Sequence, residues 1–252
     1  VQEWFLRAAS AIDGQPFRGE CRKLRVLKGV PLPNFEEQAT RFRVQIEPET
    51  NHPLAQNATL FDAEDVPRFT AKLVRFADGV ELSNGSSPAA PRHWQTVNWS
   101  RSDLYESKLF HGPAFAAISA VERIGDSGTQ ASLTGSQSLG WSQEAWISDP
   151  ALIDGGLQLA RIWGLESVGQ LTLPTAIESF ILHEPGLFNQ LGVEERSVRC
   201  VLYGKPIGQS GTRSDLWFID EGTGKILAEI HGLEMYMSSE TPLESGAIVD
   251  AV

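Results

Sequence analysis

Three polar residues interrupt an otherwise apolar stretch between positions 151 and 163. Asp154, Gln158 and Arg161 are spaced i, i+4 and i+7, so on a helix they share one face. A buried carboxyl group is costly unless it is partnered, and burial raises its pKa because the charged form is disfavoured. Such a group can hold a proton near neutral pH and give it to a leaving group. The spacing leaves two interpretations: a catalytic acid oriented by Gln158, or a structural carboxylate paired with Arg161.

The same stretch carries the signals of a buried helix. Asp149 is a favourable N-cap, because its carboxylate can accept hydrogen bonds from the first free N–H groups. Pro150 fits the first helical position, where a missing N–H costs nothing. Apolar side chains then occupy nearly every side, which is typical of a helix enclosed by other elements. Gly155 and Gly156 weaken a helix by about 1 kcal/mol each relative to alanine, so the pair indicates close approach of a substrate or another backbone.

Three motifs occur in an order that resembles the dehydratase domains of polyketide synthases and polyunsaturated fatty acid synthases. LFHGPAF at 109–115 is similar to that family's aromatic-x-Tyr-Gly-Pro-x-Phe segment, with His111 where tyrosine is common. DPALIDGGLQ contains an Asp-x-x-x-Gln motif, and LTLPTAIESF at 171–180 is similar to the Leu-Pro strand that follows it. The resemblance implies that Asp154 and Gln158 are catalytic. It also implies a set of substrate-binding residues, which are His111, Gly112, Pro113, Phe115, Leu173 and Pro174.

The resemblance extends over almost the whole chain and implies an α+β double hot dog fold, in which two antiparallel sheets are each wrapped around a central helix. VQEWFLRAA at the start resembles the first central helix, and LRVLKGV at 24–30 the strand after it. Alternating apolar and polar residues independently predict half-buried strands. The expected helix spans 1–12, and the expected strands span 21–27, 40–46, 57–62, 69–76, 115–122, 130–136, 176–182, 197–203, 216–220 and 226–235. We expect a first half at 1–78, a linker rich in Gly, Ser and Pro at 79–100, a second half at 101–238 and a tail or linker at 239–252.

One expected feature is missing from the sequence. The family's general base is a histidine in a His-x-x-x-Gly-x-x-x-x-Pro motif before the first central helix, and the chain opens at Val1 inside what resembles that helix. The five histidines are His52, His93, His111, His183 and His231. Only His111 lies in a recognised motif. The sequence is therefore expected to begin within an incomplete first half, and either truncation or natural loss explains the missing histidine.

The implied reaction is elimination of water from a 3-hydroxyacyl thioester. A histidine would take the α-proton, Asp154 would protonate the departing hydroxyl, and backbone N–H groups at Gly112 would polarise the thioester carbonyl. No metal or organic cofactor is expected, because the thioester itself acidifies the α-carbon. The resemblance further implies that the substrate arrives on the phosphopantetheine of an acyl carrier protein. Two alternatives remain open. One is a catalytically incomplete pseudo-dehydratase that acts as an acyl-binding or structural module, and the other is an isomerase or product-template-like cyclase on the same fold.

The composition of the chain limits the classes of partner that it is expected to bind. The 252 residues carry a formal net charge of −11, which disfavours nucleic acid as a ligand. No apolar run approaches the length of a membrane helix, and two cysteines without a framework fit a reducing, cytoplasmic location. The expected partners are the acyl carrier protein, neighbouring synthase domains and, as a further option, a second copy. A basic cluster could dock the carrier or simply form a solvated face, and consists of Arg22, Lys23, Arg25 and Lys28.

Overall fold

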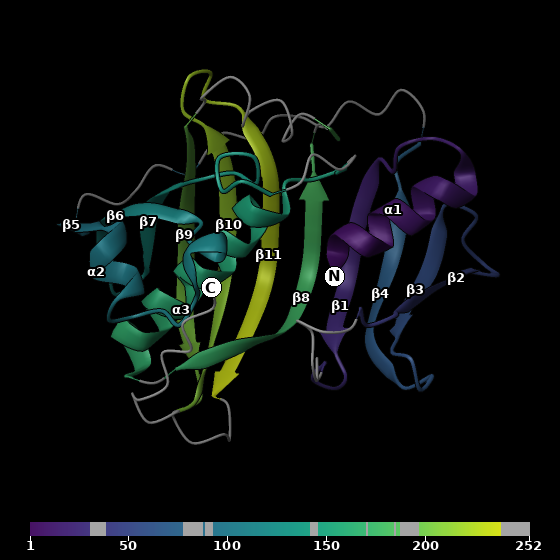
Figure 1. Ribbon diagram of the computed structural model, residues 1–252, viewed down its shortest axis with the longest axis horizontal. Helices are drawn as coiled ribbons and strands as arrows, with labels where there is room; N and C mark the ends of the chain where they lie inside the picture. The colour runs from purple at the N-terminus through teal and green to yellow at the C-terminus, as the bar shows by residue number, and fades with distance from the viewer. Residues whose placement is uncertain are drawn as a thin grey trace.

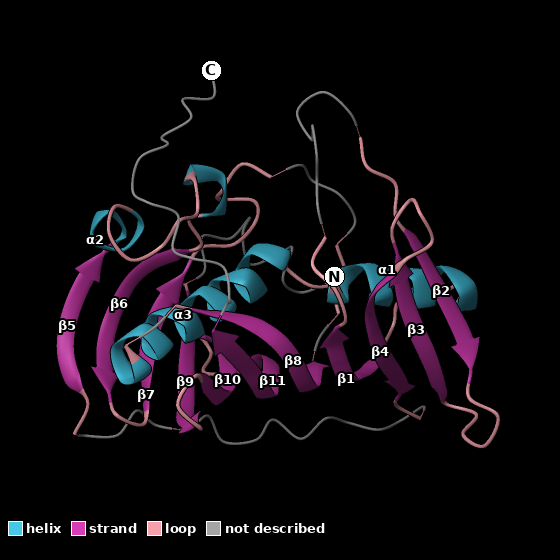
Figure 2. Ribbon diagram, turned by 90° about the horizontal axis from the view of Figure 1, so that it is seen from below, coloured by secondary structure: helices cyan, strands magenta, loops and turns pink. Residues whose placement is uncertain are grey.

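The computed structural model describes residues 1–30, 39–77, 88, 93–141, 146–169, 171–183, 185–186 and 197–237. Within these ranges, two long helices lie on the same side of a curved antiparallel sheet (Figure 2). The helices are α1 (Gln2–Asp13) and α3 (Pro150–Val168), and the short α2 (Arg101–Tyr105) and the 3-10 turn η1 (Pro113–Phe115) lie between them in sequence. The expected tail at 239–252 lies outside the described residues.

The local signals for α3 act as the sequence predicts. The Asp149 carboxylate accepts hydrogen bonds from the N–H groups of Ala151 and Leu152, at 3.0 and 3.2 Å. Pro150 is the first helical residue, and the helix ends at Gly169 in the left-handed conformation. α3 packs against β6 to β10, which is why its apolar side chains face several directions at once.

The eleven strands lie in the order β2-β3-β4-β1-β8-β11-β10-β9-β7-β6-β5 (Figure 1). Neighbouring strands run antiparallel throughout, as expected from the alternating sequence patterns. Their bounds are β1 (Gly19–Val26), β2 (Arg43–Pro48), β3 (Ala55–Phe61), β4 (Pro67–Arg75), β5 (Gln95–Ser100), β6 (Ile118–Gly125), β7 (Gly128–Leu133), β8 (Thr172–Leu182), β9 (Val198–Ile207), β10 (Gly211–Asp220) and β11 (Ile226–Met237).

The strand order contains an internal repeat. After α1, the next four strands lie in the order β1-β4-β3-β2, and after α3 the next four lie in the equivalent order β8-β11-β10-β9. β1 pairs with β8, with Cys21 opposite Phe180, so the two expected sheets are joined at their edges into one. β5, β6 and β7 extend the second repeat beyond β9.

Two expectations about the connections need correction. Residues 95–100 were expected in the linker, but they form β5, which pairs with β6. The strand expected at 115–122 begins later, at Ile118, because the backbone from Pro113 to Phe115 forms a 3-10 turn. The domain boundaries themselves stay predictions, since most of 79–94 lies outside the described residues.

The buried core is continuous under both helices. Phe5 on α1 and Trp163 on α3 are fully buried, whereas Trp4 is 41% exposed. Cys21 and Cys200 are buried and unpaired. No helix in the described part of the chain combines the length and the apolar character needed to cross a bilayer.

Candidate functional site

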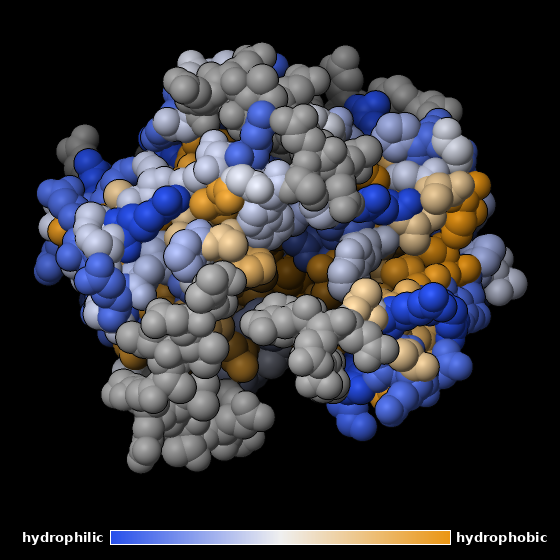
Figure 3. Space-filling view, viewed as in Figure 1, coloured by the Kyte–Doolittle hydropathy of each residue, from blue (hydrophilic) through white to orange (hydrophobic). Residues whose placement is uncertain are grey.

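A cavity of about 330 Å³ lies between the two repeats and includes Asp154 in its wall. Leu24, Val26 and Phe69 line it from the first repeat, and Phe115 and Pro174 line it from the second. Apolar side chains gather in the depression between the two parts of the molecule (Figure 3). This size and apolar lining are typical of sites that bind small organic groups.

The cavity acid is partnered by the residue one helical turn away. The Gln158 Nε2 atom donates a hydrogen bond to Asp154 Oδ2 at 2.6 Å, as the i, i+4 spacing predicts. Asp154 is partly buried, and desolvation raises the pKa of its carboxyl group above its ordinary range. The hydrogen bond from Gln158 acts in the opposite direction, but burial is the larger effect. Asp154 therefore has the environment of a proton donor.

A second set of hydrogen bonds fixes Gln158 itself. Its Nε2 atom also donates to the Phe115 carbonyl at 2.8 Å, and its Oε1 atom accepts from the Tyr105 hydroxyl at 2.5 Å. The Tyr105 oxygen in turn accepts from the Ile118 N–H at 2.8 Å. Sequence reasoning missed Tyr105. The only local signal was Ser100-x-x-Asp103, whose capping box starts the helix that carries it.

The alternative of an Asp154–Arg161 ion pair is wrong. Arg161 lies two turns along α3, and its guanidinium group stacks over the Phe110 ring at 4.6 Å. Its Nη1 atom makes a long hydrogen bond of 3.4 Å to the Thr172 carbonyl. Within the described ranges, no carboxylate pairs with this side chain. Asp154 is therefore not a member of a structural ion pair with Arg161.

His111 lies close enough to Asp154 for their charges to interact. Its ring stacks on Phe110, with 4.3 Å between centroids, and its Nδ1 atom is buried without a hydrogen-bond partner. Desolvation lowers the pKa of His111, and the Asp154 charge opposes that shift only in part. A neutral imidazole and a protonated carboxyl group are thus the forms that burial favours here.

The other predicted substrate-binding residues divide into two groups. Phe115 and Pro174 line the cavity, and the Phe115 ring meets Trp141 edge to face at 5.3 Å. Gly112, Pro113 and Leu173 are exposed and are not among the lining residues. At Gly112 an added Cβ would meet no atom within 4 Å, which leaves room beside the backbone for a bound group. The binding roles of all these residues stay predictions.

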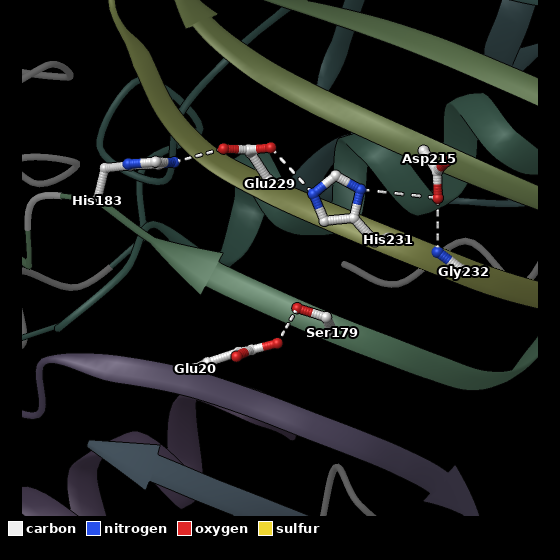
Figure 4. A network of polar contacts seen from close by, with 7 residues as sticks. All are labelled: Glu20, Ser179, His183, Asp215, Glu229, His231 and Gly232. Carbon is white, nitrogen blue, oxygen red and sulfur yellow. Dashed lines mark hydrogen bonds and ion pairs between the residues drawn. The ribbon is translucent and has the colours of Figure 1, made fainter. Parts of the chain in front are cut away.

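Two histidines belong to a separate network, on the face of the sheet opposite α3. Ala228 and Ile230 of β11 are buried in the core, so Glu229 and His231 point the other way. Glu229 joins both histidines, with His183 Nε2 at 2.6 Å from Oε1 and His231 Nε2 at 2.9 Å from Oε2 (Figure 4). Neither histidine can therefore serve as the base beside Asp154.

The remaining polar candidates do not join the cavity. His52 and His93 are exposed in turns. In the expected basic cluster, Arg22 contacts Glu20 at 2.5 Å, and Arg25 lies 3.6 Å from Glu234. Across the described ranges, no three His, Cys, Asp or Glu side chains converge as metal ligands would.

Comparisons with known sequences identify a family for most of the chain. The family profile described as "Polyketide synthase dehydratase N-terminal domain" matches residues 84–245, well over half of the chain. A polyunsaturated fatty acid synthase polypeptide of Thraustochytrium sp. is 27% identical over 179 residues, which make up 69% of this chain and 6% of that protein. The chain thus spans a small fraction of this relative.

Comparisons with solved structures match the fold. The dehydratase domain of a mycocerosic acid synthase-like polyketide synthase superposes with a TM-score of 0.71 at 18% identity, covering 93% of this chain and 79% of that one. The pyran synthase domain from module nine of the sorangicin pathway superposes with a TM-score of 0.70 at 15% identity, covering 94% and 85%. At these identities the likeness concerns the fold alone, and it confirms the double hot dog class.

Proposed function

Because the chain belongs to the polyketide synthase dehydratase family, we propose that it eliminates water from 3-hydroxyacyl thioesters to give trans-2-enoyl thioesters. One observation carries the proposal: a carboxyl group with a raised pKa stands in the wall of an apolar cavity and is oriented by an amide. Asp154 supplies the acid and Gln158 orients it. An acid with a raised pKa is suited to protonating a poor leaving group such as hydroxide.

The elimination breaks two bonds of the substrate. A base takes the α-proton, and the electron pair of the broken carbon–hydrogen bond moves toward the thioester carbonyl. Backbone N–H groups near Gly112 stabilise the charge that develops there. The electron pair then forms the α,β double bond while the β-carbon–oxygen bond breaks. Asp154 gives its proton to the departing oxygen, which leaves as water. The proposal assigns the acid to this chain and does not assign the base.

The thioester itself supplies the activation. It acidifies the α-carbon, so the reaction requires no metal or organic cofactor. The relative in Thraustochytrium is part of a fatty acid synthase, and family members act within multidomain synthases. We therefore place the substrate on the phosphopantetheine of an acyl carrier protein in the cytoplasm, with neighbouring synthase domains as partners. A second copy of the chain is a further candidate partner.

The decisive experiment replaces Asp154 in the natural gene product that contains this chain. With a 3-hydroxyacyl pantetheine thioester as the probe, Asp154→Asn should lower kcat at least about 100-fold, because general acid catalysis contributes about that much or more. Asp126→Asn, in the turn between β6 and β7, is the matched control and should leave kcat unchanged.

Three outcomes would overturn the proposal. Full activity in Asp154→Asn would exclude this residue as the acid. Binding of the probe without turnover by the natural protein would instead identify a pseudo-dehydratase. A migrated double bond or a new ring in the product, with no enoyl thioester released, would identify an isomerase or a cyclase.

A further inference from the structure

Tyr105 connects the backbone of β6 to the amide that orients the cavity acid. It is the last residue of α2, a helix fixed at its start by a capping box between Ser100 and Asp103. Its hydroxyl accepts a hydrogen bond from the Ile118 N–H at 2.8 Å and donates one to Gln158 Oε1 at 2.5 Å. Because the backbone N–H can only donate, the hydroxyl proton must point toward Gln158.

This arrangement gives every atom of the Gln158 amide group a fixed direction. One N–H points to Asp154 Oδ2 and the other to the Phe115 carbonyl, while Oε1 faces the Tyr105 hydroxyl. Rotation of the amide by 180° would set Oε1 against the Phe115 carbonyl. It would also turn the NH₂ group toward Tyr105, and the hydroxyl proton of Tyr105 would then lose its acceptor.

The orientation of the amide decides where the acid carries its proton. Since Gln158 donates to Oδ2 of Asp154, the proton of the neutral carboxyl group belongs on Oδ1. A rotated amide would offer its oxygen to the carboxyl group instead, and the acidic proton would then be held in a hydrogen bond to Gln158. With Oε1 engaged by Tyr105, that proton remains available to a bound substrate.

We propose that Tyr105 is a positioning residue, which acts through Gln158 to keep the transferable proton of Asp154 on Oδ1. This inference rests on the proposed function for its catalytic meaning. Its structural part, the dependence of the acid on Tyr105, can be tested without any turnover. The positioning role of Tyr105 and the proposed function can therefore fail separately.

The first test follows the titration of Asp154 in the chain by the carbon-13 shift of its carboxyl group, assigned by its loss in Asp154→Asn. Tyr105→Phe should raise the pKa of Asp154, because a less well-oriented Gln158 stabilises the carboxylate less. Gln158→Ala should raise it as well, and the double variant should match Gln158→Ala alone. Tyr236→Phe, at an exposed tyrosine on β11, is the matched control and should change nothing.

The second test measures the reaction in the natural gene product. Tyr105→Phe should lower kcat about 10-fold and leave KM within about 2-fold, since it misplaces a proton donor without removing a binding contact. Activity that needs protonated Asp154 falls as the pH rises through the pKa of that group. The alkaline limb of the pH–rate profile should therefore move to higher pH in Tyr105→Phe, which a general loss of structure would not cause.

A variant that should shift the pKa of Asp154 in the opposite direction covers the case in which Tyr105→Phe does not fold. In a background of Tyr203→Phe and Tyr236→Phe, 3-fluorotyrosine incorporated throughout occupies only position 105. Its more acidic hydroxyl is a stronger donor and polarises the Gln158 amide further, so the pKa of Asp154 should fall relative to the same background with tyrosine.

Distinct results separate the inference from the proposed function. An unchanged Asp154 titration in Tyr105→Phe, or effects of Tyr105→Phe and Gln158→Ala that simply add, would overturn the role of Tyr105. A shifted titration together with full activity of Asp154→Asn would leave the positioning intact and overturn the catalytic proposal.

Discussion

The Glu3 carboxylate accepts two hydrogen bonds from Ser148, a residue 145 positions away, at 2.9 Å from the backbone N–H and 2.6 Å from the hydroxyl. A third bond comes from the Ile147 N–H at 2.7 Å. Glu3 is 3% exposed and lies on α1, while Ser148 directly precedes the N-cap of α3. One carboxylate of the first repeat thus fixes the start of the helix that carries the cavity acid.

Glu3→Ala is expected to destabilise the chain by about 3 kcal/mol. The substitution leaves three donors without their acceptor, and an unsatisfied buried group costs roughly 1–3 kcal/mol. Urea denaturation measures the effect. Glu221→Ala, at an exposed position, should stay within about 0.5 kcal/mol of the unsubstituted chain. A comparable loss in both variants would show that Glu3 has no special role.

His111 should act on substrate binding rather than on the chemical step. Its buried Nδ1 atom has no partner within the described residues, and its charge interacts with that of Asp154 although His111 does not itself line the cavity. We therefore expect a polar group of a substrate bound at Asp154 to become its partner. His111→Phe retains a ring to stack on Phe110 and should raise KM about 10-fold, the equivalent of one lost hydrogen bond, with little change in kcat. Steady-state kinetics of the natural gene product with a pantetheine thioester separate the two constants. If kcat instead fell by about 100-fold or more, His111 would be a base or an acid in the reaction.

The network around Glu229 makes the stability of the fold depend on pH. Hydrogen bonds from His183 and His231 lower the pKa of Glu229 from 4.5 to about 2, so its contribution is present above pH 4.5 and is lost as the pH falls toward 2. Asp215 and Glu229 raise the pKa of His231 from 6.5 to about 9, so its contribution is full below pH 6.5 and is lost as the pH rises toward 9.

We therefore expect this network to stabilise the fold most between pH 4.5 and 6.5. Urea denaturation at several pH values should show a decline above pH 6.5 that His231→Gln removes, since the slope reports up to about one proton. His52→Gln, at an exposed position, should retain the decline. A pH dependence identical in all three proteins would exclude His231 as its source.

The sequence predicts best those features that are determined by neighbouring residues. The start of α3 at Asp149 and Pro150 follows from capping, and the contact between Asp154 and Gln158 follows from the helical period. The late start of β6 was not predicted, because Phe115 is a residue type that favours strands, although it ends the 3-10 turn that begins at Pro113.

Features that depend on distant partners could not be predicted in this way. The hydroxyl of Tyr105 meets a residue 53 positions away, and Glu3 meets one 145 positions away. Nothing in the residues around either one indicates that distant partner. The pairing of Cys21 on β1 with Phe180 on β8 is of the same kind, because local patterns predict strands but do not assign their neighbours.

Gly156 determines how closely α3 approaches the sheet. A Cβ at this position would lie 2.5 Å from Phe218 Cζ and 3.1 Å from Leu216 Cδ2, both on β10. Alanine improves helix propensity by about 1 kcal/mol, but overpacking of a core typically costs about 1–3 kcal/mol. The steric cost should exceed the gain in helix propensity, because a methyl group cannot be accommodated at 2.5 Å from the Phe218 ring by a small shift.

Gly156→Ala is accordingly expected to lower the free energy of unfolding by up to about 2 kcal/mol, the difference between those two terms. Gly155→Ala is the matched control, since its Cβ would meet Leu133 Cδ2 at 3.1 Å and Ala117 Cβ at 3.2 Å, contacts that a small shift relieves. If the Phe218 ring causes the loss, Gly156→Ala should cost less in a Phe218→Leu background, and a double-mutant cycle measured by urea denaturation gives that coupling. Equal stability of the two alanine variants would mean that α3 can move away from β10 at no cost, and that the glycine pair has another purpose.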